Sequence, residues 1–263
     1  MSRKIKRKLK TGAFVVCAAG SFVFLQRLAK ATKESDNTDA DNEYLADPDE
    51  QAVPDDLPEP TVYERFGKRA LDKVLSFAGL VALAPAFAMI ALAIEIDDPG
   101  PVLFKQKRVG KDKHFFEMHK FRSMKMSAPK DVPAEAFEDQ EKYVTRVGRF
   151  LRKTSLDELP QLWDVFRGKM SLVGPRPVIW TTRELIHERD KYCANNVMPG
   201  ITGLAQINGR DRLDNVKKAE LDGQYVKSLR ESLSGGFLTD LKCLKATPEA
   251  VLSEYKRENT DGE

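Results

Sequence analysis

The stretch Thr154-Ser155-Leu156-Asp157-Glu158-Leu159-Pro160-Gln161-Leu162 places two adjacent carboxylates at the edge of an apolar segment. Apolar residues then recur at helical spacing, at Leu159, Leu162, Trp163 and Phe166. Pro160 belongs in the first turn of this helix, because a proline deeper inside would clash with the carbonyl four residues back. The sequence therefore predicts a helix that begins near Asp157. Both carboxylates would lie at the positive end of its dipole, where ionised acids and bound phosphate are favoured.

The same residues also fit a purely structural interpretation. Ser155 and Glu158 have the spacing of a capping box, and Asp157 alone is an acceptable N-cap. Taken by itself, the stretch favours helix capping over catalysis. The motifs on either side of it change that balance.

Charge is segregated along the 263-residue chain, although its net charge is only +3. Residues 1–10 form a basic run, whereas residues 34–60 carry many acids and no lysine or arginine. Such asymmetry indicates a surface-binding tail followed by a solvated linker. Three scattered cysteines predict neither a disulfide framework nor a cysteine-based metal site, and the three histidines show no ligand spacing.

The N-terminal segment, residues 1–32, combines the basic run with an apolar stretch, Ala13–Leu25, that is too short for an ordinary membrane span. No small-residue cleavage site follows it, so we interpret it as an uncleaved membrane-associated segment, with a spanning anchor as the alternative. Residues 33–62 are acidic and contain several prolines. They have too few large apolar residues to order themselves and are predicted to be a disordered linker.

The second hydrophobic stretch, Val74–Ile94, is uncharged and long enough to cross a bilayer. Pro85 lies in its middle, where a proline removes a backbone hydrogen bond and favours a bend. Lysines and arginines flank the stretch on both sides, and such residues tend to stay in the cytoplasm. These features predict a hairpin that enters and leaves the membrane on the cytoplasmic side, with a simple span as the alternative.

Beyond this stretch, the patterns predict a small globular unit. Val102–Phe104 and Phe115–Met118 are expected to be short strands or buried turns around a basic loop, and the polar stretch Ser127–Glu141 a mobile excursion. Amphipathic helices are expected around Asp157–Arg167, Thr181–Cys193 and Val216–Leu229, and residues 247–263 form a polar tail.

Two further stretches carry polar groups on turns. In Met170–Pro177, Arg176 lies between two prolines, which restrict its backbone and suit it to act as a phosphate clamp. The alternative there is a rigid surface turn. Met198–Arg210 contains three glycines that allow close approach of a ligand, together with Gln206, Asn208 and Arg210. The alternative there is a β-hairpin closed by an Asn-Gly turn.

Together, these motifs resemble the bacterial sugar transferase family of monotopic phosphoglycosyl transferases. The resemblance covers roughly Tyr63–Ala246. It rests on the proline-broken apolar segment followed by Lys120–Met124, Ser155–Gln161, Gly168–Pro177 and Pro199–Gly203. Where the family commonly has Ser-Pro at the helix break, this chain has Ala84-Pro85. The resemblance implies transfer of a sugar-1-phosphate from a UDP-sugar to polyprenyl phosphate, with release of UMP.

The family also implies residue roles. Asp157 matches the nucleophile, and Glu158 matches the neighbouring acid associated with Mg²⁺. Basic residues that match phosphate-binding positions are Arg152, Arg176 and Arg69, the last in an Arg-x-x-Asp pattern with Asp72. The positions that match the nucleotide-binding region are Gly203, Gln206, Asn208, Gly209 and Arg210.

The expected fold is therefore α+β and mainly helical, with a re-entrant membrane hairpin, a small cytoplasmic catalytic domain and interfacial amphipathic helices. The implied setting is the bacterial inner membrane, with the domain facing the cytoplasm and the bilayer as a partner. A homo-oligomer and downstream glycosyltransferases remain open as further partners. A nucleic-acid-binding module is disfavoured, because the basic residues cluster beside the apolar segment without interleaved aromatics. A multi-span transferase is disfavoured by the presence of only two hydrophobic segments, and a non-catalytic binding protein by the intact carboxylate pair.

Overall fold

The computed structural model describes residues 26, 45, 59–128 and 140–260. The expected membrane-associated segment Ala13–Leu25, nearly all of the acidic linker and most of the polar excursion Ser127–Glu141 lie outside the described residues.

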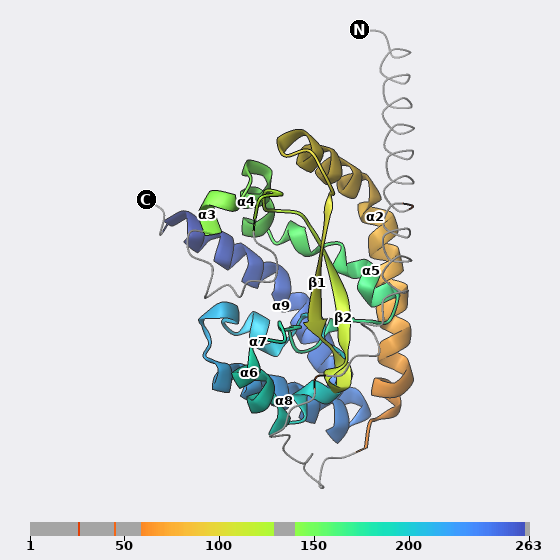
Figure 1. Cartoon of the computed structure of the whole chain (residues 1–263). Coiled ribbons are helices and arrows are strands. Elements are labelled where there is room, and N and C mark those ends of the chain that lie inside the picture. The colour runs from red at the N-terminus through yellow and green to blue at the C-terminus, as the bar shows by residue number, and fades with distance from the viewer. Residues whose placement is uncertain (1–25, 27–44, 46–58, 129–139, 261–263) are drawn as a thin grey trace, which may run out of the picture.

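The described part is mainly helical with a few short strands, which confirms the α+β class (Figure 1). Its helices are α2 (Lys68–Asp97), α3 (Gln140–Tyr143), α4 (Arg146–Lys153), α5 (Gln161–Phe166), α6 (Arg183–Asp190), α7 (Leu204–Ile207), α8 (Asn215–Glu231) and α9 (Leu233–Thr260). Its strands are β1 (Leu103–Val109), β2 (Phe115–Phe121), β3 (Ser171–Val173) and β4 (Gly200–Thr202). A π-helical turn, Tyr63–Gly67, leads directly into α2.

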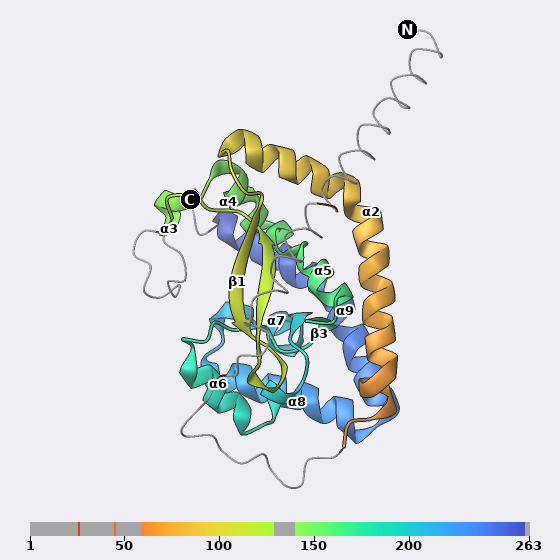
Figure 2. The same ribbon diagram turned by 45° about the vertical axis from the view of Figure 1, so that its right-hand side comes forward.

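Helix α2 contains the predicted apolar segment, and Pro85 lies inside it. Together with the preceding turn it forms the one helix among the described residues that is long and apolar enough to cross a membrane, by its length of 35 residues and its composition. Figure 2 shows that α2 changes direction part-way along, so that its two arms wrap around the rest of the domain. Pro85 supplies the physical cause of such a bend, because it cannot donate to the helical ladder.

One face of α2 packs on the domain and the remainder is exposed. Leu80, Phe87 and Ile94, spaced seven residues apart, are buried against a cluster that includes Phe121 and Leu151. The ring centroids of Phe87 and Phe121 lie 5.8 Å apart in an edge-on arrangement. The outer faces expose large apolar side chains, namely Val74, Leu75, Phe77, Val81, Met89, Leu92 and Ile96. An apolar surface of this extent is typical of a membrane or protein contact.

Polar contacts attach both arms of α2 to the same domain. Near its start, the Lys68 ammonium lies 2.7 Å from the Asp240 carboxylate of α9, and both side chains are buried. One turn later, the Asp72 carboxylate accepts hydrogen bonds from Ser171 Oγ at 2.6 Å and from the amide of the next residue at 3.0 Å. At the other end, the amide of Val147 donates to Asp97 at 2.9 Å.

Strands β1 and β2 form an antiparallel hairpin with Leu103 opposite Phe121 and Val109 opposite Phe115. Both strands are longer than the sequence patterns indicated. The charged residues of β1 are only partly buried, so they did not produce the alternation by which a strand is recognised. The hairpin places Lys120 near one end of β2, within 4.0 Å of the carboxylates of both Asp157 and Glu158.

Strands β3 and β4 pair in parallel, with Ser171 opposite Gly200 and Val173 opposite Thr202. Residues 198–210 therefore do not form the β-hairpin considered as an alternative above. The chain leaves β3, passes through α6 and returns as β4, which is followed directly by α7. A glycine at position 203 is required there, since a side chain would meet the carbonyl of Gly174.

Helix α9 continues without interruption across the expected boundary between residues 246 and 247. It crosses the domain from the start of α2 toward α4, as Figure 1 shows. Tyr225 of α8 joins these parts, because its hydroxyl contacts both Asp240 of α9 and the carbonyl of Val173, each at 2.9 Å.

Candidate active site

The acidic pair lies in a short turn that precedes α5. Asp157 and Glu158 belong to the 3-10 turn Leu156–Glu158, and α5 begins only at Gln161, with Pro160 as its N-cap. The predicted helix start near Asp157 is thus wrong by one turn. Proline favours the position before or at the first helical residue, and here it separates the acidic turn from the helix.

The capping interpretation also fails in its geometry. Ser155 adopts a left-handed backbone conformation, with φ of 54°, and its side chain makes no cap hydrogen bond. Its hydroxyl instead lies 3.3 Å from Nη1 of Arg210. Both carboxylates are therefore available for interactions other than helix capping.

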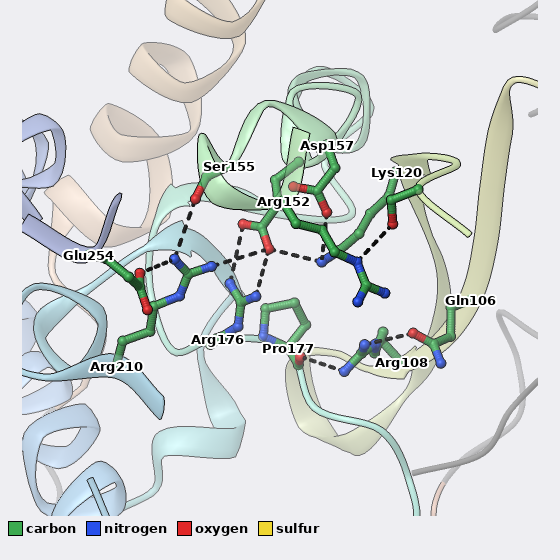
Figure 3. A network of polar contacts seen from close by, with 12 residues as sticks. Gln106, Arg108, Lys120, Arg152, Ser155, Asp157, Arg176, Pro177, Arg210 and Glu254 are labelled. Atoms are coloured by element: carbon green, nitrogen blue, oxygen red, sulfur yellow. Dashed lines mark hydrogen bonds and ion pairs between the residues drawn. The ribbon is translucent and has the colours of Figure 1, made fainter. Parts of the chain in front are cut away.

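Glu158 is the centre of a cluster of positive charge. Its Oε1 atom lies 2.6 Å from Nη2 of Arg176, 2.8 Å from Nζ of Lys120 and 3.7 Å from Nη2 of Arg210. Figure 3 shows these three basic side chains converging from separate parts of the chain. Burial by itself would raise the pKa of Glu158, but Arg176, Lys120 and Arg210 outweigh it and hold that pKa well below its usual range.

Asp157 has a different environment. Its carboxylate is also buried, and the Lys120 ammonium lies 4.0 Å from it. Burial and the neighbouring charge of Glu158 raise the pKa of Asp157, while Lys120, Arg152 and Arg176 oppose that rise. The two acids thus differ in basicity: Glu158 is firmly ionised, and Asp157 is the more basic carboxylate.

Both carboxylates line a cavity of about 460 Å³ in which basic residues outnumber acidic ones. The basic residues that line it are Arg108, Lys120, Arg122, Lys125, Arg152, Lys153, Arg176 and Arg210. A cavity with this charge and size suits a polyanionic small molecule such as a nucleoside diphosphate derivative.

Arg176 is positioned through its backbone as well as through Glu158. Its carbonyl accepts a hydrogen bond from Nη1 of Arg189 at 3.0 Å. Arg189 is in turn held by the carboxylate of Asp222, at 2.7 Å and 2.8 Å, and both side chains are buried. The turn that carries Arg176 is therefore anchored to α6 and α8, which argues against a loose surface turn.

The acidic turn and the strand that carries Lys120 are joined by a buried pair. The carboxylate of Asp164 in α5 lies 2.7 Å from Nδ1 of His119 and accepts the His119 amide at 2.9 Å. Because His119 precedes Lys120 and Asp164 lies in the helix that follows the acidic turn, this pair ties the backbone next to Lys120 to α5. The histidines showed no ligand spacing in the sequence, and this structural role could not be read from it.

The structure does not bring all the expected site residues together. Arg152 lines the cavity and donates to Ser123 Oγ at 3.0 Å, whereas Arg69 is exposed and lines a separate cavity of about 420 Å³ at the start of α2. Arg69 therefore lies apart from the carboxylates.

The positions expected to bind the nucleotide are divided in the same way. Arg210 lines the cavity of the carboxylates, and Gln206 lines an adjoining cavity of about 240 Å³. Gly203 serves close packing against Gly174. Asn208 donates to a carbonyl of its own helix, Leu204, at 2.8 Å, and Gly209 has a positive φ of 143°.

Several residues of the cavity were not assigned a role from the sequence. Lys120 lay within one of the quoted motifs, and Arg108 lay in the expected basic loop, but neither pattern distinguished them from other surface bases. The Arg108 guanidinium donates to the carbonyl of Pro177 at 3.3 Å and to Gln106 at 2.6 Å. Burial, together with the charge of Arg176, lowers the pKa of Arg108 to about 10.

The donor set can be tested against Mg²⁺, the cofactor implied by the resemblance. Among the described residues, no group of three or more acidic, histidine or cysteine side chains could hold a metal ion. Carboxylate oxygens suit Mg²⁺, but the oxygens of Glu158 already contact Arg176 and Lys120. Glu158 therefore supplies a single carboxylate donor, and a complete Mg²⁺ site there would need further oxygen donors from a ligand.

Comparison with known proteins decides the family. The family model for bacterial sugar transferase matches residues 63–254. The chain belongs to the bacterial sugar transferase family. The match starts where the resemblance was expected to start and extends beyond the expected end at residue 246, into the last turns of α9.

Several relatives of this family member have named activities. An undecaprenyl-phosphate glucose phosphotransferase from Komagataeibacter xylinus is 44% identical over 176 residues, which is 63% of this chain and 33% of that protein. The UDP-glucose:undecaprenyl-phosphate glucose-1-phosphate transferase of Escherichia coli (strain K12) is 42% identical over 170 residues, 62% of this chain and 36% of that protein. The exopolysaccharide production protein ExoY of Sinorhizobium fredii is 35% identical over 178 residues, 62% of this chain and 78% of that protein. The chain thus spans about a third of the length of the first two relatives.

The charge cluster predicts a pH-dependent contribution of Glu158 to stability. We expect Glu158→Gln to lower the thermal midpoint at neutral pH, because three basic groups lose their counter-charge. The pKa of Glu158 is depressed on folding, so its contribution is present above the unfolded value of about 4.3 and is lost as the pH falls through the folded value. The difference in thermal midpoint between the native protein and Glu158→Gln should therefore narrow only below about pH 4.3. Thermal melts over a pH series measure it, with the exposed Glu249→Gln as control. A difference that stays constant from neutral to acidic pH would contradict this assignment.

Proposed function

We propose that this chain is a phosphoglycosyl transferase that moves a sugar-1-phosphate from a UDP-sugar to polyprenyl phosphate and releases UMP. The observation that carries the proposal is the pair of adjacent buried carboxylates in a cavity that is also lined by eight basic residues. Phosphoryl transfer depends mainly on positioned positive charge, which this cavity supplies. The names of the relatives support the same reaction class.

Asp157 is the proposed nucleophile. An oxygen of its ionised carboxylate attacks the phosphorus that bears the sugar, and the bond from that phosphorus to the UMP oxygen breaks. UMP leaves with the electron pair, and the cavity's arginines and Lys120 stabilise the charge on the leaving phosphate. The phosphate oxygen of the polyprenyl carrier then attacks the same phosphorus. This step breaks the aspartyl–phosphorus bond and regenerates the carboxylate.

Asp157→Asn tests the nucleophile and the function together. We expect the native protein to release UMP from at least one UDP-sugar when polyprenyl phosphate is present, and the variant to release none, because the amide keeps the shape and loses the attacking charge. Mass spectrometry after incubation with the donor alone should find a phospho-sugar adduct on Asp157. A native protein that binds UDP but releases UMP from no UDP-sugar would instead favour a membrane-tethered binding protein.

Mg²⁺ is the proposed cofactor, held by Glu158 together with oxygens of the diphosphate. When bound, it would neutralise charge on the diphosphate. Arg176 and Lys120, which contact Glu158, would then bind phosphate oxygens instead. This exchange requires no new residue, since all three side chains already line one cavity.

The exchange predicts that the metal and the nucleotide bind together. We expect isothermal titration calorimetry to detect little Mg²⁺ binding to the protein alone and clear binding when UDP is present, because Glu158 is neutralised by basic groups until a diphosphate engages them. EDTA should stop UMP release, and added Mg²⁺ should restore it. Tight binding of Mg²⁺ without nucleotide, or activity that is indifferent to EDTA, would exclude this role.

The proposed location is the bacterial inner membrane, with the catalytic domain in the cytoplasm and α2 as a re-entrant hairpin. Both ends of α2 are bonded to the same domain, through Lys68 and Asp240 at one end and through Asp97 and Val147 at the other. A helix attached in this way supports entry and exit on one side of the membrane. In lipid, backbone groups freed at Pro85 cost several kcal/mol each unless they are satisfied, so the bend is expected where other parts of the protein or water can reach it.

Single-cysteine labelling tests this topology. We expect cysteines at Arg65 and Lys111, both with exposed side chains, to be protected from a membrane-impermeant thiol reagent in intact cells and labelled after lysis. The native Cys193 and Cys243 are buried and are replaced in the background, as is Cys17. Labelling of one site and protection of the other in intact cells would mean that α2 spans the membrane.

A further inference from the structure

The last turns of α9 reach the cavity of the acidic pair. Residues 247–263 were expected to be a polar tail outside the catalytic domain, but α9 carries Glu254 into the wall of that cavity. Figure 3 shows Glu254 beside Arg210, on the opposite side of the guanidinium from the acidic turn. Glu254 is the one carboxylate besides Asp157 and Glu158 that lines this cavity in the described part of the chain.

Arg210 forms a close ion pair with Glu254. The distance from Nη1 of Arg210 to Oε2 of Glu254 is 2.6 Å, whereas its Nη2 lies 3.7 Å from Oε1 of Glu158. Each of the two side chains is about a fifth exposed, at 21% and 23%, so water reaches the pair only in part. The backbone of Arg210 is left-handed, with φ of 51°, a conformation that costs free energy in a residue other than glycine. Its side-chain contacts therefore help to keep this residue in place.

The pair also separates two spaces. Arg210 and Glu254 both line the basic cavity of about 460 Å³ and the adjoining, more apolar cavity of about 240 Å³. The smaller cavity is covered by α9 through Thr247, Ala250 and Val251. A change in the position of Arg210 would therefore alter both spaces at once.

A carboxylate in a cavity built for phosphate has an unfavourable direct effect, because it repels the ligand. Its presence needs a compensating role, and the geometry supplies one. Besides Glu254, Arg210 has Glu158 as an acidic partner, and Glu158 already contacts Lys120 and Arg176. Without Glu254, the guanidinium would move toward Glu158 and away from the open cavity.

We infer that Glu254 is a positioning residue that holds the guanidinium of Arg210 at the cavity wall, so that its Nη2 edge can bind a phosphate oxygen of the nucleotide. This inference rests on the proposed function. It makes the C-terminal part of α9 a component of the donor site.

The test compares Glu254→Gln with the native protein, using the affinity for UDP from calorimetry and the steady-state constants with the UDP-sugar that the native protein uses. We expect the variant to bind UDP about tenfold more weakly, a loss of about 1.4 kcal/mol. KM should rise, while kcat and the thermal midpoint should change little. Glu254→Asp, which retains the charge, should recover part of the affinity. Glu249→Gln, an exposed change on the same helix, should behave like the native protein.

The sign of the effect distinguishes positioning from simple charge. If Glu254 acts only as a nearby negative charge, its removal strengthens UDP binding, and this result would overturn the inference. In an Arg210→Gln background, Glu254→Gln should cause no further loss, since the group that it positions is gone. An equal loss in both backgrounds would also overturn it.

The two proposals fail in distinguishable ways. A native protein that transfers the phospho-sugar, with Glu254→Gln unchanged in UDP affinity and KM, would refute the positioning role and leave the proposed function intact. A native protein that neither binds UDP nor releases UMP would refute both.

Discussion

Glu158 is a carboxylate removed from water that stays ionised because three basic side chains surround it. Lys120 comes from β2, Arg176 from the turn after β3, and Arg210 from the turn after α7. None of these bases could be placed so close to the others without an acid between them, because their mutual repulsion in a buried site would be large. The same cluster acts on Asp157, whose pKa is raised first by burial and also by the charge of Glu158, and is lowered by Lys120 and Arg176.

The rest of the fold holds the three bases where the cluster needs them. Asp164 bonds to His119 and thereby fixes the strand position of Lys120. The buried Arg189–Asp222 pair holds the backbone of Arg176. Breaking one partner of such a buried pair is costly, on the order of 3–5 kcal/mol, because the remaining charge is left without compensation. These pairs therefore specify the geometry of the site more than they add to overall stability.

Much of the architecture was evident from the chain alone. The apolar stretch with Pro85, the amphipathic helices and the acidic turn with its neighbouring Arg176 all follow from spacing and residue type, which are local properties. The local reasoning failed at the start of α5, where Pro160 follows the acidic turn and caps the helix, and at residues 198–210. There the sequence signal of an Asn-Gly turn was overridden by the parallel pairing of β3 with β4, a contact between segments that lie far apart in the chain.

By itself, the sequence determined the family, the helix that is apolar enough to cross a membrane and the adjacent pair of acids, because each depends on residue type at short spacing. Only the tertiary structure decided which bases meet those acids. It brought Lys120 and Arg210 to Glu158, left Arg69 at a separate cavity, and placed Glu254 of α9 in the wall of the site. The physical reason is that an ion pair is set by distance in space, and these partners come from segments whose separation along the chain carries no signal of their contact.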